Sequence, residues 1–155
     1  MNPPVILFDP WPRSAPMIFR GDMRQRFERL GRVVGLDESD AGKLAPELVD
    51  ATLPEAVAVV GQTDLDAARL ARAPKLKAII NVEGNFAQNV DYAECFRRGV
   101  QVLSIAPAFA HPVAEMALGL ALDLARGITR ADRLMREGRE QYGFTGARDA
   151  FLLRG

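Results

Sequence analysis

Five short apolar runs, rich in β-branched residues, limit most strongly how this chain can fold. They are VILF (5–8), RVVGL (32–36), AVAVV (56–60), LKAII (76–80) and VQVLSI (100–105). Their near-continuous apolar character is typical of strands covered on both faces. Segments with helical spacing separate them, and such alternation predicts βαβ crossovers. We therefore expect an α/β fold of three layers, with a flavodoxin-like five-stranded parallel sheet between helices, in a strand order that the sequence does not fix.

The segments between the runs carry helix start and stop signals. They are 20–31, which ends at Gly31; 63–74, which begins with a capping-box-like Thr63-x-x-Asp66; and 91–99, with Asp91, Glu94 and a stop at Gly99. Segment 37–55 predicts only one helical turn, near Glu47–Asp50. These signals place a helix after most of the expected strands.

The final third of the chain predicts one long helix, from Pro112 to about Gly138. Proline is tolerated in a first turn, and His111 would precede it as the cap. The first half is apolar nearly all round, which predicts burial on more than one side. A helix of this length would extend about 40 Å, more than one small sheet covers, so we expect part of it to pack on something else.

Composition excludes several classes of protein. Twenty basic and twenty acidic side chains give a net charge of zero, so we expect no nucleic-acid or anionic-membrane partner. The single cysteine, Cys95, cannot form an internal disulfide or a thiolate metal site, which favours a reducing cytoplasm. The N-terminus lacks a signal-peptide pattern, and the apolar stretch from Pro112 to Ala125 is interrupted by Asp123 and is too short to span a bilayer.

The stretch NVEGNFAQNVD (81–91) is the first candidate site. It follows a predicted strand and precedes a predicted helix, so it lies at the carboxyl edge of the sheet, where open α/β sheets bind ligands. Backbone N–H groups in a turn before a helix can hold an anion. The residue pattern alone is more typical of an ordinary strand-to-helix loop.

Other chemically active side chains are few. Trp11 and Arg13 follow the first strand and could supply an aromatic wall and a carboxylate-binding guanidinium, or only a proline-stiffened surface loop. His111 and Glu115 lie one helical turn apart without a third ligand, so we expect no metal site. Cys95 has no base near it in sequence and is interpreted as a structural thiol. The sequence contains no G-x-G-x-x-G and no P-loop.

Several motifs occur in a characteristic order over residues 73–138. They are Ala73-Pro74-Lys75-Leu76-Lys77, Gly84 with Asn89-Val90-Asp91, Arg98-Gly99-Val100-x-Val102, Pro107, and Val113-Ala114-Glu115. In this order they resemble the D-isomer-specific 2-hydroxyacid dehydrogenase family, which includes phosphoglycerate, glycerate, D-lactate and formate dehydrogenases. Residues 1–72 share only the strand–helix rhythm.

The resemblance implies a domain organisation. Family members join a flavodoxin-like substrate domain to an inserted Rossmann domain that carries the glycine fingerprint. By that pattern, residues 1–110 form the substrate (catalytic) domain, 111–140 a long inter-domain or dimerisation helix, and 141–155 a linker to a Rossmann NAD(P)-binding domain that this chain lacks. The resemblance also implies NAD or NADP as cofactor of a full-length enzyme, a small 2-hydroxy or 2-oxo acid as substrate, and a homodimer through the 111–140 helix.

The candidate stretch gains a role from the resemblance. The family has Gly-x-Gly-x-Asp-Asn-x-Asp here, and its backbone N–H groups bind the substrate carboxylate. Gly84, Asn85 and Phe86 are the matching residues, with Asn85 and Phe86 supplying the amides. Two positions depart from the pattern: Phe86 replaces the second glycine, which disfavours a left-handed backbone, and Gln88 replaces the acid.

The resemblance and the residues together give two hypotheses. The first is the substrate-binding part of an oxidoreductase that transfers a hydride between NAD(P) and a 2-hydroxy or 2-oxo acid. We expect it to be inactive alone, with no catalytic residue in this chain, because the family's catalytic arginine, glutamate and histidine have no counterpart and His111 does not match. The alternative is a stand-alone flavodoxin-like module that binds a small carboxylate or dimerises without catalysis.

Overall fold

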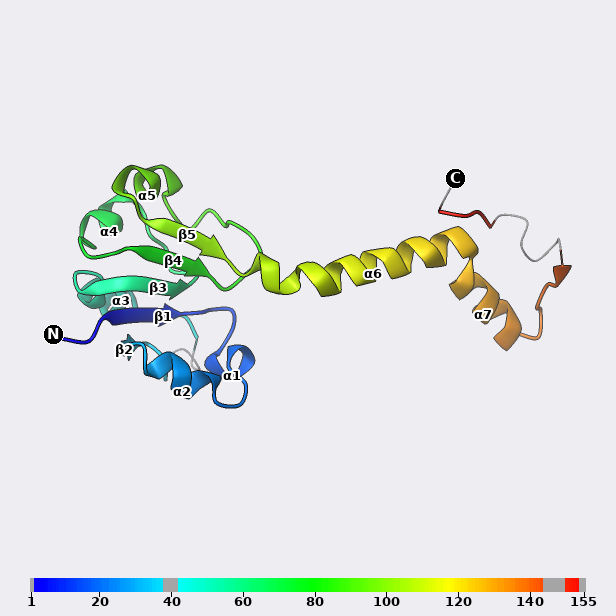
Figure 1. Cartoon of the computed structure of the whole chain (residues 1–155), viewed down its shortest axis with the longest axis horizontal. Helices are drawn as coiled ribbons and strands as arrows, with labels where there is room; N and C mark the ends of the chain where they lie inside the picture. The colour runs from blue at the N-terminus through cyan, green and yellow to red at the C-terminus, as the bar shows by residue number, and fades with distance from the viewer. Residues whose placement is uncertain (1, 38–41, 144–149, 154–155) are drawn as a thin grey trace. The chain divides into compact units, whose positions relative to one another are not determined.

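The computed structural model describes residues 2–37, 42–143 and 150–153 and divides the chain into two compact units, 1–107 and 108–155 (Figure 1). The first unit contains one five-stranded sheet in which all paired neighbours are parallel. Its strands are β1 (Val5–Asp9), β2 (Arg32–Val34), β3 (Ala56–Gly61), β4 (Ala78–Asn81) and β5 (Gln101–Ser104). The order β2-β1-β3-β4-β5 is the flavodoxin-like order, which confirms the predicted fold class.

Helices cover both faces of this sheet, as the apolar runs predict. The helices are α1 (Ala15–Ile18), α2 (Met23–Glu28), α3 (Pro46–Thr52), α4 (Ala67–Ala71) and α5 (Tyr92–Arg98). On one face, side chains of α3, α4 and α5 form the main core with β1, β3 and β4, around Leu7, Val59 and Ile79. On the other face, Phe8 packs against side chains of the α1–α2 region.

Local sequence signals explain most helix boundaries. Asp91 caps α5 by accepting a hydrogen bond from the Glu94 amide, and Gly99 ends that helix with a φ of 70°. The cap of α4 is Asp66, which accepts from the Arg69 amide, and not Thr63, which the capping-box pattern favoured. The Thr63 hydroxyl is engaged elsewhere, as described below.

The predicted single helix from Pro112 to about Gly138 is wrong in its bounds. Helix α6 runs from Ala106 to Arg126, and α7 runs from Ile128 to Arg136. Pro107 therefore occupies the first turn, while Pro112 lies inside α6 and His111 is not its cap. Gly127 separates the helices with a φ of 64°, a left-handed conformation that glycine adopts without strain.

Helix α6 exposes apolar side chains nearly all round. Those exposed by 41–80% are Phe109, Val113, Met116, Leu118, Leu120, Leu122 and Leu124. By length and composition α6 could also cross a membrane, which the apolar stretch in the sequence alone did not suggest. It carries two carboxylates, Glu115 and Asp123, which would be costly at bilayer depth. Within the second unit, the apolar side chains of this helix are therefore left exposed.

Candidate functional site

All five strands end at one edge of the sheet because they run parallel. The connections that follow β1, β3 and β4 therefore lie along that edge, where the strand order reverses between β1 and β3. Residues 82–89 connect β4 to the cap of α5. This is the stretch in which the sequence predicts an anion site.

The centre of this loop is open to solvent. Gly84, Asn85 and Phe86 are exposed, and Phe86, which is 60% exposed, forms a T-shaped ring contact with Tyr92 at a centroid distance of 6.1 Å. Within the described residues, the backbone N–H groups of these three form no hydrogen bond. No described non-glycine residue has a positive φ, which agrees with the expectation that Phe86 avoids the left-handed region. The loop thus presents free amide donors at the sheet edge.

Tyr92 supports this loop from the first turn of α5. Its hydroxyl donates a hydrogen bond to the carbonyl of Ala87. Burial raises the pKa of the Tyr92 phenol above its ordinary value, so the phenol remains a protonated donor at neutral pH. Sequence reasoning missed Tyr92, although its place one residue after the Asp91 cap directs it back toward the loop.

Arg13 and Trp11 lie in the connection after β1. The Arg13 guanidinium forms two hydrogen bonds with Glu83, from Nε to Oε1 at 2.8 Å and from Nη2 to Oε2 at 3.3 Å. These bonds raise the pKa of Arg13 and join the loops that follow β1 and β4. Trp11 is 50% exposed and precedes a cis peptide bond to Pro12. Arg13 thus reaches the candidate loop, but its charge is already balanced by Glu83, a residue that sequence reasoning did not select.

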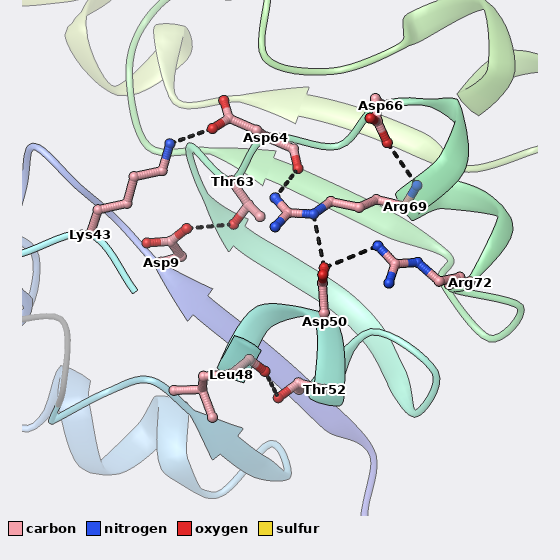
Figure 2. A network of polar contacts seen from close by, with 10 residues as sticks. All are labelled: Asp9, Lys43, Leu48, Asp50, Thr52, Thr63, Asp64, Asp66, Arg69 and Arg72. Carbon is pink, nitrogen blue, oxygen red and sulfur yellow. Dashed lines mark hydrogen bonds and ion pairs between the residues drawn. The ribbon is translucent and has the colours of Figure 1, made fainter. Parts of the chain in front are cut away.

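A buried carboxylate lies where β1 ends. Asp9 is 1% exposed and accepts hydrogen bonds from the Leu44 amide at 3.2 Å and from the Thr63 hydroxyl at 2.9 Å. Figure 2 shows Thr63 pointing at Asp9, with ion pairs of Lys43 with Asp64 and of Arg69 with Asp50 nearby. The other charged groups of this cluster form ion pairs, whereas the Asp9 carboxylate is held by these two hydrogen bonds.

The remaining candidates lie in α5 and α6. Cys95 is fully buried in α5, and burial raises the pKa of its thiol, as expected for a structural cysteine. His111 and Glu115 are exposed on α6, in the second unit. Among the described residues no group of three or more His, Cys, Asp or Glu side chains is placed to hold a metal ion.

Two hollows of about 380 Å³ each occur within the units, and neither is lined by residues 82–89. One lies in the second unit beside Gly127 and Tyr142. The other lies in the first unit between Asp9, Thr63 and the start of α3. The amides of the candidate loop therefore lie outside both hollows.

The fold and this edge define a class of protein: a flavodoxin-like α/β domain with an exposed loop after its fourth strand. Residues 7–148 match the family described as D-isomer specific 2-hydroxyacid dehydrogenase, catalytic domain. The chain belongs to this family, as the motifs of residues 73–138 indicate.

Known relatives agree with this membership. The chain is 37% identical over 102 residues to D-3-phosphoglycerate dehydrogenase of Mycobacterium tuberculosis, a match covering 66% of this chain and 19% of that protein. The crystal structure of a phosphoglycerate oxidoreductase from Rhizobium etli superposes with a TM-score of 0.71 and 37% identity, covering 97% of this chain and 45% of that one. Apo D-mandelate dehydrogenase of Rhodotorula graminis shares the fold, with a TM-score of 0.67 at 16% identity. The chain thus spans less than half the length of these relatives.

The residues of this chain do not fit a nicotinamide dinucleotide. The sequence contains no glycine-rich G-x-G-x-x-G loop after a strand, so there is no helix N-terminus prepared for a pyrophosphate. The connection after β1, where such a loop would be expected, contains three prolines between residues 10 and 16 and no glycine.

Proposed function

We propose that this chain is the substrate-domain part of an oxidoreductase that transfers a hydride between NAD(P) and a small 2-hydroxy or 2-oxo acid. The observation that carries the proposal is the exposed loop with free amides at Gly84–Phe86, at the position where the sheet order favours a ligand. In this role the amides of Asn85 and Phe86 donate to the substrate carboxylate. No residue of the chain is assigned to proton transfer, and we expect the chain to be inactive by itself.

Charge in the loop region is consistent with a small monocarboxylate. The Arg13–Glu83 pair contributes no net charge, so attraction comes from the oriented N–H groups. Trp11 and Phe86 flank the edge with half-exposed aromatic surface that can cover an apolar substituent of the acid. We propose that Gly84, Asn85 and Phe86 bind the carboxylate, while Trp11 and Arg13 border the site.

Binding can be tested with pyruvate on the isotopically labelled chain. We expect millimolar pyruvate to shift the amide resonances of Asn85 and Phe86 and uncharged methyl pyruvate to leave them in place, because only the acid offers a carboxylate. Amide resonances of α3 serve as the internal reference. Equal responses to both compounds, or pyruvate shifts confined to other regions, would contradict the proposed carboxylate site.

We propose further that α6 mediates a homodimer. Val113, Met116, Leu120 and Leu124 recur at helical spacing along one side of α6, and each is more than half exposed. Leu118 and Leu122 lie on the opposite side. Two apolar sides allow α6 to contact a twin subunit and a second domain at once. Because such a helix would pack on protein and not on lipid, we assign the protein to the cytoplasm.

The oligomeric state tests this role of α6. We expect light scattering after size exclusion to give a dimer for the chain and a monomer for Leu124→Glu, because a charge at this 80% exposed position would be buried unpaired in the interface. The matched control is Phe96→Glu on α5, which is 72% exposed and should leave the dimer intact. A wild-type monomer at about 100 μM would reject the dimer, since obligate interfaces bind well below that concentration.

The alternative function is a stand-alone carboxylate-binding or dimerisation module. It would use the same loop at Gly84–Phe86 and the same helix α6. It is supported by the same two observations, the exposed loop at Gly84–Phe86 and the exposed apolar side chains of α6. Hydride transfer separates the two functions, and its measurement is given in the Discussion.

A further inference from the structure

The proposed function leaves one buried charge without a role. Asp9 is 99% buried, and a carboxylate in such a place is tolerated only when hydrogen bonds compensate its lost hydration. Its Oδ1 accepts from the Leu44 amide at 3.2 Å, and its Oδ2 accepts from the Thr63 hydroxyl at 2.9 Å. Thr63 is itself only 2% exposed. The side chain of Thr63 is therefore fixed from within the sheet (Figure 2).

The backbone of Thr63 also contacts the candidate loop. Its carbonyl accepts a hydrogen bond of 2.9 Å from Nδ2 of Asn89, the last residue of the loop. The Oδ1 of Asn89 is buried without a hydrogen-bond partner among the described residues, so the Nδ2–Thr63 bond alone orients this amide. Two backbone bonds accompany it, from Leu65 N to Asn89 O at 2.7 Å and from Asp91 N to Leu65 O at 2.9 Å. The connection after β3 thus anchors the end of the loop that follows β4.

The start of the loop is anchored separately. Glu83 is held by Arg13, and among the described residues the amides of Gly84–Phe86, which lie between these anchors, have no hydrogen-bond partner. Their direction is then set by these two anchors and by the Tyr92 hydroxyl, which donates to the carbonyl of Ala87. Donors fixed in advance bind an anion more tightly than donors that must be ordered on binding.

We propose that the substrate-carboxylate loop is positioned by a chain of contacts that runs from Asp9 through Thr63 to Asn89. Asp9 holds the Thr63 side chain in place by accepting its hydroxyl hydrogen bond. Asn89 in turn holds the end of the loop in place by donating to the Thr63 carbonyl. This inference rests on the proposed function, because it assigns these residues to the same carboxylate site. None of the three is expected to touch the substrate.

The test compares two threonines of equal chemistry in the full 155-residue chain. Thr63→Val removes the hydroxyl that supports the loop. Thr52→Val removes another buried hydroxyl, which donates to the Leu48 carbonyl at 2.7 Å in α3, a helix that ends near the opposite edge of the sheet. Both variants are expected to lower the melting temperature. Thr63→Ser keeps the hydroxyl and serves as the rescue. Asn89→Ala removes the hydrogen bond from Asn89 Nδ2 to the Thr63 carbonyl, at a residue that is less buried than Thr63.

Pyruvate affinity, read from the Asn85 and Phe86 amide resonances well below the melting temperature, distinguishes positioning from stability. We expect Thr63→Val and Asn89→Ala to raise Kd about fivefold, the effect of one net hydrogen bond. Thr52→Val and Thr63→Ser should stay within about twofold of wild type. Unchanged affinity in Thr63→Val and Asn89→Ala would overturn the positioning role alone. A wild-type chain without a pyruvate response would overturn the proposed carboxylate site, and this inference with it.

Discussion

Replacing Gly61 by alanine is expected to lower the free energy of unfolding of the first unit by at least about 3 kcal/mol. Gly61 ends β3 with a φ of 142°, and a Cβ there would lie 1.9 Å from the carbonyl oxygen of Asp9 and 2.3 Å from its carbonyl carbon. These are backbone atoms of the neighbouring strand, so no side-chain rotation relieves the overlap. Either β1 and β3 separate or the chain fails to fold.

Gly99 provides the matched control for this substitution. It also has a positive φ, of 70°, but a Cβ there meets nothing within 4 Å. Gly99→Ala should therefore cost only the conformational strain, about 1 kcal/mol. Urea unfolding followed by far-ultraviolet circular dichroism measures both variants. Equal losses for the two would show that the close approach of Gly61 to Asp9 does not exist in solution.

The strands could be predicted from the sequence because burial on both faces produces continuous apolar runs. All five runs became strands, and the Asp91 and Gly99 signals correctly bounded α5. The start of α6 was missed because Pro107 and Pro112 both satisfy the rule for a first-turn proline. The break at Gly127 was missed because a single glycine within an apolar helical pattern is often tolerated.

The candidate site could be predicted only in part. A loop at a strand end can be read from local order, so residues 82–89 were placed correctly at the sheet edge. The partners of that loop could not be read, because they come from distant parts of the chain. Arg13 and Glu83 are 70 residues apart, and Asp9 and Thr63 are 54 apart. Thr63 also matched a capping pattern, which concealed its contact with Asp9.

The second large effect is expected at the amides of the loop. Asn85→Pro and Phe86→Pro each remove one N–H group, whereas Asn85→Ala and Phe86→Ala remove the side chains and keep the donors. A hydrogen bond to a charged group contributes about 1.5–3 kcal/mol, so each proline should reduce kcat/KM about 10- to 100-fold. Each alanine variant should reduce it much less if the backbone, and not the side chain, holds the carboxylate.

An enzyme with a complete nucleotide domain is needed to measure this effect. The Rhizobium etli phosphoglycerate oxidoreductase is a suitable host, since its structure matches 97% of this chain at 37% identity. In the chimera, this chain replaces the matching part of that protein, and the remainder supplies what this sequence lacks. Circular dichroism and NAD(P)H binding establish that each variant is folded and able to bind the cofactor.

Oxidation of NADH or NADPH by this chimera, in the presence of pyruvate, glyoxylate or hydroxypyruvate, tests the central claim most directly. We predict turnover that depends on a 2-oxo acid, that falls about 10- to 100-fold in the proline variants and is retained in the alanine variants, and that the 155-residue chain alone does not show. A folded chimera that binds the cofactor but oxidises it with none of these acids would contradict the proposed function and favour a binding module. Proline variants as active as their alanine counterparts would contradict the assignment of the loop.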